Sequence, residues 1–380
     1  MGPAIIFDKS AFQALSRDEH GQRLFMFMEN TTPILLREIV ADLTKPEASG
    51  IAASQVVSSL ASKFCGDGGA VSMDWKALCL ESLVGNEIPM TGQIIPYGLS
   101  HVVGPDREPA LFLGPTEANE GILRWVRSVF TAEERVTADK FRREAEAFEL
   151  ESLWGRLDRD RVTLAKSIEA IAPIVDTFLD SEVNYPDVLN WLVDQLRPLS
   201  PKARIPELRK HVQETWRRDR RVLRSAAPYA HHCARSLLML LVGSNVLSQR
   251  PTNRLDIEYF LYLPFCHLFV SNDRVHRQLV NSLLRPYQMF ATGDDFKRDL
   301  GRFVEARDSA ERALRTRRSF AFGTRPWPAP KSILWTVWEK AYPWYPGGGN
   351  RAVRIDAAEQ ALAIAEAKEL VAAVKATAGS

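Results

Sequence analysis

The fold is decided by the stretch Arg254–Arg277, RLDIEYFLYLPFCHLFVSNDRVHR. Its first part predicts a short helix, because apolar residues recur at three- to four-residue spacing and Asp256 lies in the first turn, where a negative charge suits the helix dipole. A turn at Pro264 follows, and then a short apolar run closed by polar residues predicts a buried strand over His267–Ser271. Asp273 ends that strand and precedes a new helical pattern. We therefore expect Asp273 at the carboxyl edge of a sheet, where open α/β sheets bind ligands.

The amino terminus repeats this order of strand, acid and helix. The run Ala4–Phe7 is apolar and too short for a helix, Asp8 ends it, and a helical pattern begins at Lys9. Further along, Pro33–Leu43 (PILLREIVADL) predicts a helix that is capped by a threonine and has proline at its first position. Glu38 adjoins the apolar stripe of this helix, so we expect it to face inward.

Four acids in this chain resemble, in their order and their positions at element ends, the acids of a PIN-type nuclease domain: Asp8, Glu38, Asp256 and Asp273. The resemblance covers about residues 4–44 and 250–300. It implies an α/β fold, with a PIN-like three-layer α/β/α core around a mostly parallel sheet. It also implies that the four carboxylates converge on one or two Mg²⁺ or Mn²⁺ ions and that the domain cleaves nucleic acid.

The residue types suit that chemistry. Magnesium and manganese prefer carboxylate, water and phosphate oxygens, and an ion among crowded carboxylates can activate a water for attack on phosphate. Ser10 is a weaker candidate for holding a bound water and Asn272 for orienting Asp273. The basic residues Lys9, Arg37 and Arg274 each adjoin a proposed acid and are candidates for phosphate contacts.

The sequence therefore predicts a metal-dependent nuclease, with RNA as substrate in preference to DNA, in which a regulatory protein partner can restrain activity. One alternative is a non-catalytic PIN-like module that binds nucleic acid or protein, and a further one is a DNA nuclease of flap-nuclease type. The acids can also simply cap helices or face solvent. A haloacid-dehalogenase phosphatase would need an acid where Ser10 stands, and a response-regulator receiver would need an early acid pair; the sequence has neither.

Three regions are predicted. Residues 1–45 and 250–300 form a discontinuous nuclease core, residues 46–249 form a mainly helical insertion, and residues 301–380 form a carboxyl-terminal segment. Within the insertion, Lys202–Arg224 is the most basic stretch and carries Trp216 among arginines, which suits either nucleic-acid stacking or a solvated helix. A second basic stretch covers Ala313–Pro328, and a tryptophan- and proline-rich segment and an alanine-rich helix close the chain.

Composition narrows the class of protein. The chain has 380 residues, of which 46% are hydrophobic and 25% charged, as in globular proteins, and its net charge of +2 leaves nucleic-acid contacts to local patches. Four scattered cysteines argue against a zinc site or a disulfide framework. The longest apolar run, Leu237–Gly243, is too short to span a bilayer, and the first residues do not form a signal peptide pattern. A cytoplasmic protein without membrane contact is therefore expected.

Five further residues are assigned structural roles. Asp294 and Asp295 follow a predicted last strand, and we favour a helix cap over a metal ligand. His231 and His232 are adjacent on a helix, so they point about 100° apart and cannot share a metal. His276 lies one turn after Asp273, near the predicted sheet edge, and we expect a structural role for it in preference to a contact with substrate.

Overall fold

The computed structural model describes residues 2–45, 50–64, 70–103, 109–113, 116–155, 157–196, 210, 214, 223–248, 250–314 and 332–343. The described residues up to Tyr97 and from Thr116 to Tyr342 form one compact unit. A second unit contains an antiparallel hairpin of β4 (Leu99–Val103) and β5 (Pro109–Leu113).

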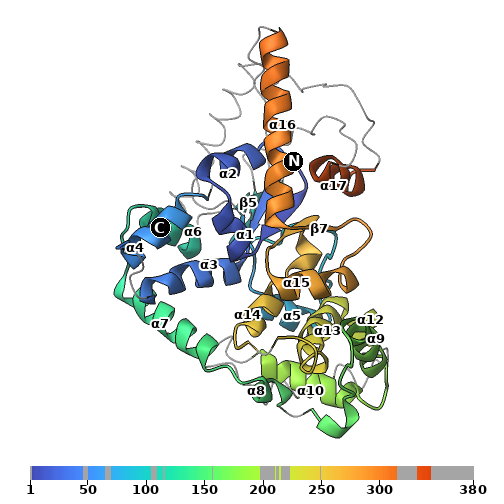
Figure 1. Ribbon diagram of the computed structural model, residues 1–380. Coiled ribbons are helices and arrows are strands. Elements are labelled where there is room, and N and C mark those ends of the chain that lie inside the picture. The colour runs from blue at the N-terminus through green and yellow to red at the C-terminus, as the bar shows by residue number, and fades with distance from the viewer. Residues whose placement is uncertain are drawn as a thin grey trace. The chain divides into compact units, whose positions relative to one another are not determined.

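The core of the first unit is a five-stranded sheet in the order β3-β2-β1-β6-β7 (Figure 1). All four strand pairs are parallel. The strands are β1 (Ala4–Phe7), β2 (Met28–Thr31), β3 (Ala70–Val71), β6 (Leu268–Val270) and β7 (Met289–Ala291). Every residue of β1 and β6 is buried, as parallel strands covered on both faces require. The strands predicted over Ala4–Phe7 and His267–Ser271 are thus confirmed, the second of them shorter at both ends than predicted.

Two groups of helices pack around this sheet. In one group, α16 (Gly293–Leu314) contacts α1 (Lys9–Ala14), α2 (Arg17–Arg23) and α17 (Ile333–Ala341). In the other, α13 (Pro228–Val242) contacts α5 (Trp75–Leu83) and α14 (Asn253–Phe260), which in turn contacts α15 (Arg274–Leu279). Figure 1 shows α1 and α2 beside the lower part of α16, and α14 and α15 close together. The arrangement is compatible with a three-layer α/β/α core.

Local sequence signals explain how the elements near the sheet edge begin. The helix α3 (Pro33–Val40) starts as predicted, because the Thr32 hydroxyl accepts a hydrogen bond from the Leu35 amide and Pro33 takes the first position. The pattern of Gln22–Met28 does not decide between strand and helix, and we preferred a short strand that leads to Thr31. In the structure α2 continues to Arg23, and the strand that reaches Thr31, β2, begins only at Met28.

The region predicted as an insertion contributes directly to the sheet. The strand β3 lies within residues 46–249, yet it pairs with β2, and two residues are too short a run to show as a strand in the sequence. The helices of this region belong to the same compact unit as the sheet. They are α4 (Ala53–Ala61), α5, α6 (Glu117–Val126), α7 (Ala132–Glu146), α8 (Leu150–Trp154), α9 (Ile168–Leu179), α10 (Tyr185–Gln195), α12 (Leu223–Ala226) and α13.

The helix α13 explains the apolar run that is too short to cross a membrane. Thirteen of its residues are buried, which suits a helix that is apolar on all sides and enclosed by other helices. None of the helices in the described part of the chain is long and apolar enough to cross a bilayer. Cys79, Cys233 and Cys266 are buried free thiols that form no disulfide bond.

Several predicted features fall largely or wholly outside the described residues. They are most of the basic segment Lys202–Arg224 with Trp216, the second basic stretch after Leu314 and the alanine-rich helix. Of the tryptophan-rich segment, α17 is described, and Trp338 on it is buried. Before α17, the Ser332 hydroxyl caps the helix and donates to the Asp299 carboxylate of α16 at 2.9 Å.

Candidate functional site

Two predicted site segments meet at the point where the order of the strands in the sheet reverses. The chain runs from β1 to β2 on one side and later places β6 on the other side of β1. In such sheets the crevice at the carboxyl ends of the two diverging strands is the usual ligand site. Asp8 follows β1 directly, and Ser271, Asn272 and Asp273 follow β6. This edge of the sheet therefore carries two of the four predicted acids.

Asp8 is buried at this edge and is held by hydrogen bonds. It caps α1 by accepting from the Ala11 amide at 2.7 Å, and the Ser271 hydroxyl donates to its second oxygen at 2.5 Å. The Ser10 hydroxyl lies 2.9 and 2.8 Å from the two carboxylate oxygens. Burial alone would raise the pKa of Asp8, but His276 and these donors outweigh it and lower the pKa. Asp8 is therefore a carboxylate at neutral pH.

Glu38 faces inward, as the sequence predicts. Its carboxylate accepts a hydrogen bond from the Tyr259 hydroxyl of α14, and that hydroxyl accepts from the Lys9 amide at 3.2 Å. Tyr259 thus connects α14 with α1 and α3. Burial raises the pKa of Glu38, and the negative charge of Asp8 adds to the effect, although Tyr259 and Lys9 oppose it.

Asp256 and Asp273 complete the group. Asp273 caps α15 by accepting from the Val275 amide at 2.6 Å. The pKa of Asp256 is raised to about 7, first by burial and then by the negative charges of Asp273, Glu38 and Asp8, while His276 opposes this. All three other acids act on Asp256, so the structure brings the four predicted carboxylates into one electrostatic neighbourhood. We refer to Asp8, Glu38, Asp256 and Asp273 as the acid cluster.

His276 contacts three of the segments that carry the acid cluster. Its Nε2 is 2.7 Å from the Asp256 carbonyl oxygen and its Nδ1 is 2.6 Å from the Ser271 hydroxyl oxygen. The same hydroxyl accepts from the Asp273 amide at 2.9 Å and donates to Asp8, so only a protonated Nδ1 satisfies every partner. Both ring nitrogens therefore donate, and His276 is an imidazolium in this arrangement.

The surroundings of His276 maintain its charge. The imidazole is fully buried against the rings of Tyr259, Phe260 and Phe269, with centroids 5.6, 5.2 and 5.0 Å away. Burial would lower its pKa, but the Asp8 carboxylate, whose oxygen is 3.6 Å from Nδ1, and the other acids raise it to about 9. The structural role expected for His276 is thus compatible with its burial, while its positive charge was not predicted. The one feature of the sequence that could have indicated the charge is that His276 lies one helical turn after Asp273.

The acid cluster does not form a finished metal-ligand set. Across the described ranges, no three or more His, Cys, Asp or Glu side chains are arranged to hold a metal ion. Each acid has at least one hydrogen-bond partner or a close charge of its own, as given above. The donor chemistry nevertheless suits Mg²⁺ or Mn²⁺, because the groups present are carboxylates. Burial first, and then the repulsion among these carboxylates, raises the pKa of Asp256.

The polar neighbours of the cluster differ from several predicted roles. Asn272 does not orient Asp273; its side-chain oxygen accepts from the Gly293 amide at 2.8 Å and so fixes the start of α16. Lys9 forms an ion pair with Asp42 at 2.6 Å, so its positive charge is neutralised by a residue of the protein, in contrast to the predicted phosphate contact.

The two arginines beside the acids also differ from one another. Arg37 pairs with the buried Glu258 of α14. Its charge is therefore used within the fold, in contrast to the predicted phosphate contact. Arg274, at the start of α15, is exposed and remains available for such a contact.

The other acids and histidines behave as structural residues. The cap of α16 is Thr292, whose hydroxyl accepts from the Asp295 amide at 3.1 Å and donates to the Asp295 carboxylate at 2.7 Å. Asp294 and Asp295 lie in the first turn of the helix and are not the cap that the sequence pattern favoured. His232 binds the Phe260 carbonyl oxygen through Nε2 at 2.8 Å, and His231 is buried beside it on α13. Burial is the main reason that the pKa values of these histidines fall to about 3 and about 4 respectively, so both are neutral at pH 7.

Comparison of the chain with protein-family models, with curated proteins and with solved structures gives no match.

Proposed function

We propose that this protein is a PIN-like, metal-dependent nuclease that hydrolyses phosphodiester bonds, with RNA as substrate in preference to DNA. The observation that supports this most directly is the electrostatic coupling of Asp256 to Asp273, Glu38 and Asp8. Such a cluster destabilises the fold unless a cation compensates it. Its place at the switch point of a parallel sheet is also where ligands bind in open α/β sheets.

In this proposal the acid cluster holds one or two Mg²⁺ or Mn²⁺ ions, which would activate the attacking water and stabilise charge on the phosphate. The protein's own groups set the geometry. Ser10 and Ser271 fix the Asp8 carboxylate, and Tyr259 fixes Glu38. The exposed Arg274 is the candidate for binding a substrate phosphate at this edge.

The test is cleavage of labelled single-stranded RNA and DNA in Mn²⁺, Mg²⁺ or EDTA by the protein and by Asp8→Asn and Asp273→Asn. Asparagine keeps the helix-capping oxygen at both positions, so the fold should be preserved. Loss of one carboxylate should lower the cleavage rate by about 100-fold or more. Asp18→Asn, an exposed acid in the first turn of α2, is the matched control and should cleave normally.

A second measurement does not depend on finding the substrate. Mn²⁺ should raise the unfolding temperature of the protein and of Asp18→Asn, but not that of Asp8→Asn, because an ion that binds only the folded state stabilises it. Cleavage that persists in both acid-cluster variants would mean that another group or a contaminant is responsible. No cleavage of any substrate, together with no effect of Mn²⁺ on unfolding, would refute the proposal.

A non-catalytic nucleic-acid-binding or protein-interaction module is the second candidate. The observation in its favour is that the His276 imidazolium already supplies a positive charge next to the acid cluster. For the nucleic-acid form of this candidate, fluorescence anisotropy should show RNA binding in EDTA that weakens steeply with salt and is unchanged in Asp8→Asn. Binding that requires Mn²⁺ and the Asp8 carboxylate would favour the nuclease instead.

A further inference from the structure

A pocket of about 370 Å³ lies on the same edge of the sheet as the acid cluster. Pro33 comes just after β2 and Ser72 directly after β3, and both line the pocket. Because the strands are parallel, these positions are carboxyl ends, like those of Asp8 and Asp273. Neighbouring strands lie about 4.8 Å apart, so the ends of β3 and β1, with β2 between them, are about 10 Å apart. The pocket is therefore a neighbour of the acid cluster.

The helix α3 contributes to both the pocket and the acid cluster. Arg37 lines the pocket, and the next residue, Glu38, belongs to the cluster. Arg37 pairs with Glu258 of α14, and Glu38 accepts a hydrogen bond from Tyr259, the next residue of α14. These two contacts fix α3 against α14 and so hold the pocket in a constant position beside the acids.

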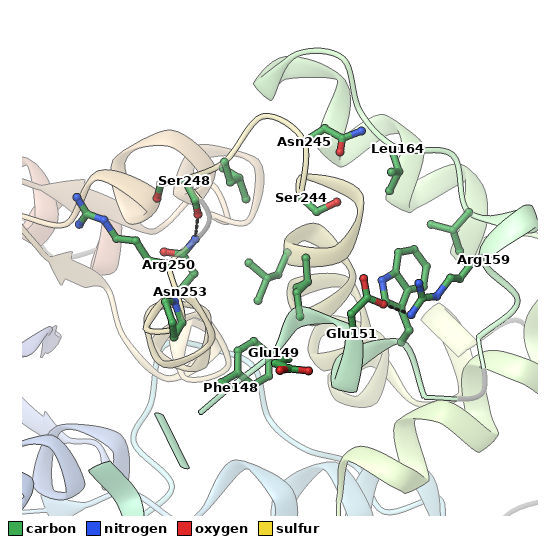
Figure 2. A pocket seen from close by; sticks show the side chains of 16 residues that line it. Phe148, Glu149, Glu151, Arg159, Leu164, Ser244, Asn245, Ser248, Arg250 and Asn253 are labelled. Atoms are coloured by element: carbon green, nitrogen blue, oxygen red, sulfur yellow. Dashed lines mark hydrogen bonds and ion pairs between the residues drawn. The ribbon is translucent and has the colours of Figure 1, made fainter. Parts of the chain in front are cut away.

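A larger pocket, of about 610 Å³, is shown in Figure 2 and lies between α8, the carboxyl end of α13 and the start of α14. Glu149, Glu151, Arg159 and Arg250 line it, two acidic and two basic side chains, and Glu151 and Arg159 form an ion pair with each other. None of the four acids of the cluster lines this pocket. It is therefore not part of the proposed nuclease site.

The walls of the smaller pocket, at the sheet edge, are mainly apolar. The contributing side chains are Leu36, Val40, Val71, Ala118 and Trp125. All of these except Ala118 belong to the buried core, and the Trp125 indole is also fixed by donating to the Glu134 carboxylate at 3.0 Å. A wall that is held in place by packing can accept a flat or apolar group without rearranging.

An exposed aromatic side chain forms part of the rim. Tyr97 lines the pocket and is 56% exposed, and in the described part of the chain it is the one aromatic among the exposed large hydrophobic residues. Its backbone is held against β3, because its amide donates to the Val71 carbonyl at 2.8 Å and the preceding Pro96 bridges to Ser72. Aromatic rings exposed in this way are typical of sites on which unpaired bases stack.

Two polar side chains of opposite charge complete the lining. Arg37 carries donors and stays 33% exposed although it pairs with Glu258. Asp74 carries acceptors and uses Oδ1 to cap α5 by accepting from the Lys76 amide at 2.9 Å. Burial would lower the pKa of Arg37, but nearby groups that include Glu258 and Asp74 raise it, which places Asp74 near the guanidinium. A pocket with one positive and one negative group favours a neutral ligand that has both donors and acceptors, and the edges of nucleobases have both.

We propose that this pocket holds an unpaired base of a single-stranded substrate, stacked on Tyr97, while Arg37 and Asp74 provide a donor and an acceptor for its edge. The inference rests on the proposed nuclease function for the class of ligand. It adds the reason for a single-stranded substrate, because the bases of a duplex are stacked on one another and cannot enter a pocket. A neighbouring part of the same strand then lies at the acid cluster.

Fluorescence anisotropy with two labelled strands tests this proposal. One is a short single-stranded phosphorothioate RNA, whose backbone resists cleavage, and the other is the same strand with every base replaced by hydrogen. The two strands carry the same charge and differ only in their bases. In Mn²⁺ the strand with bases should bind about 10-fold more tightly, because stacking of one base on an aromatic ring contributes about this much.

Variants of the rim and the wall locate the base. Tyr97→Ala should weaken the strand with bases about 10-fold and leave the abasic strand unchanged, whereas Tyr97→Phe keeps the ring and should bind normally. Ala118→Leu should also weaken the strand with bases, because the larger side chain occupies the pocket. Val183→Ala, which removes part of a 71% exposed side chain between α9 and α10, is the control and should bind like the unchanged protein.

Equal binding of the two strands, no detectable binding of the strand with bases, or no effect of Tyr97→Ala would each overturn the proposal. Base-dependent binding through Tyr97 without metal-dependent cleavage would keep the base site and refute the nuclease. Metal-dependent cleavage without any role for Tyr97 would do the reverse. If Ala118→Leu does not fold, the comparison of Tyr97→Ala with Tyr97→Phe and Val183→Ala still decides the question.

Discussion

Replacing His276 with phenylalanine should remove a large pH dependence of stability. Phenylalanine fits the aromatic surroundings formed by Tyr259, Phe260 and Phe269, because its ring is close in size to imidazole. Phenylalanine cannot donate a hydrogen bond to the Asp256 carbonyl or to Ser271, and it lacks the positive charge that His276 places next to the acid cluster. The variant therefore tests whether this charge stabilises the folded state.

The magnitude follows from the difference between the folded and unfolded states. The pKa of His276 is about 9 in the folded protein, against the ordinary histidine value of 6.5. A group whose pKa is raised on folding contributes stability that is complete below pH 6.5 and is lost as the pH rises through about 9. At about 1.4 kcal/mol for each pH unit, the full contribution is roughly 3 kcal/mol, of which about 2 kcal/mol should be lost between about pH 7 and pH 9.5.

The assay is urea unfolding in EDTA, followed by tryptophan fluorescence, at about pH 7 and about pH 9.5. Buried cysteine and tyrosine side chains, whose pKa values burial raises, also reduce stability at high pH, but they do so in both proteins. The difference between the protein and His276→Phe therefore reports the charge of the histidine together with the change that its removal causes in the titration of Asp256, whose pKa His276 lowers. His267→Phe is the control, because burial lowers the pKa of His267 to about 4 and it stays neutral over this range.

The unchanged protein should lose about 2 kcal/mol more than His276→Phe between the two pH values, whereas His267→Phe should lose as much as the unchanged protein. If the pH dependence is the same in His276→Phe as in the unchanged protein, His276 is not charged in the folded state. The hydrogen-bond assignment around Ser271 would then also be wrong, since it requires a protonated Nδ1.

Three further changes have defined outcomes. Asp256→Asn should stabilise the protein in EDTA at pH 8 by about 1–3 kcal/mol, because the Asp256 pKa of about 7 reflects burial and like-charge repulsion, and it should weaken any Mn²⁺ stabilisation; destabilisation would contradict the repulsion. Glu258→Gln should destabilise it by about 3–5 kcal/mol in urea unfolding, because the buried partner of Arg37 is lost; a cost below about 1 kcal/mol would show that the pair is solvated. Gly92→Ala should lower the unfolding temperature and cost about 2 kcal/mol, because Gly92 has φ +82° and a Cβ there would be 2.7 Å from the His267 ring; an unchanged temperature would mean that the loop adjusts.

The sequence determined the features that a few neighbouring residues encode. The apolar runs AIIF and LFV predicted β1 and β6, and the acids that follow them lie between strand and helix as predicted. Both acids cap the helix that follows, which the sequence offered only as the alternative to metal binding. The threonine and proline before α3 marked its start. These predictions succeed because capping hydrogen bonds and strand burial act over two to four positions. They identified the segments of the acid cluster but not its contacts.

Tertiary structure decided how those segments meet. Asp8 and Ser271 are separated by 263 positions, and their hydrogen bond exists only because β1 and β6 are neighbours in the sheet. The same pairing encloses His276 and gives it a charge, which no local pattern indicates. Arg37 likewise turned from a predicted phosphate contact into the partner of Glu258, 221 positions away. A side chain's charge and partners depend on long-range packing, whereas its helix or strand depends largely on its neighbours.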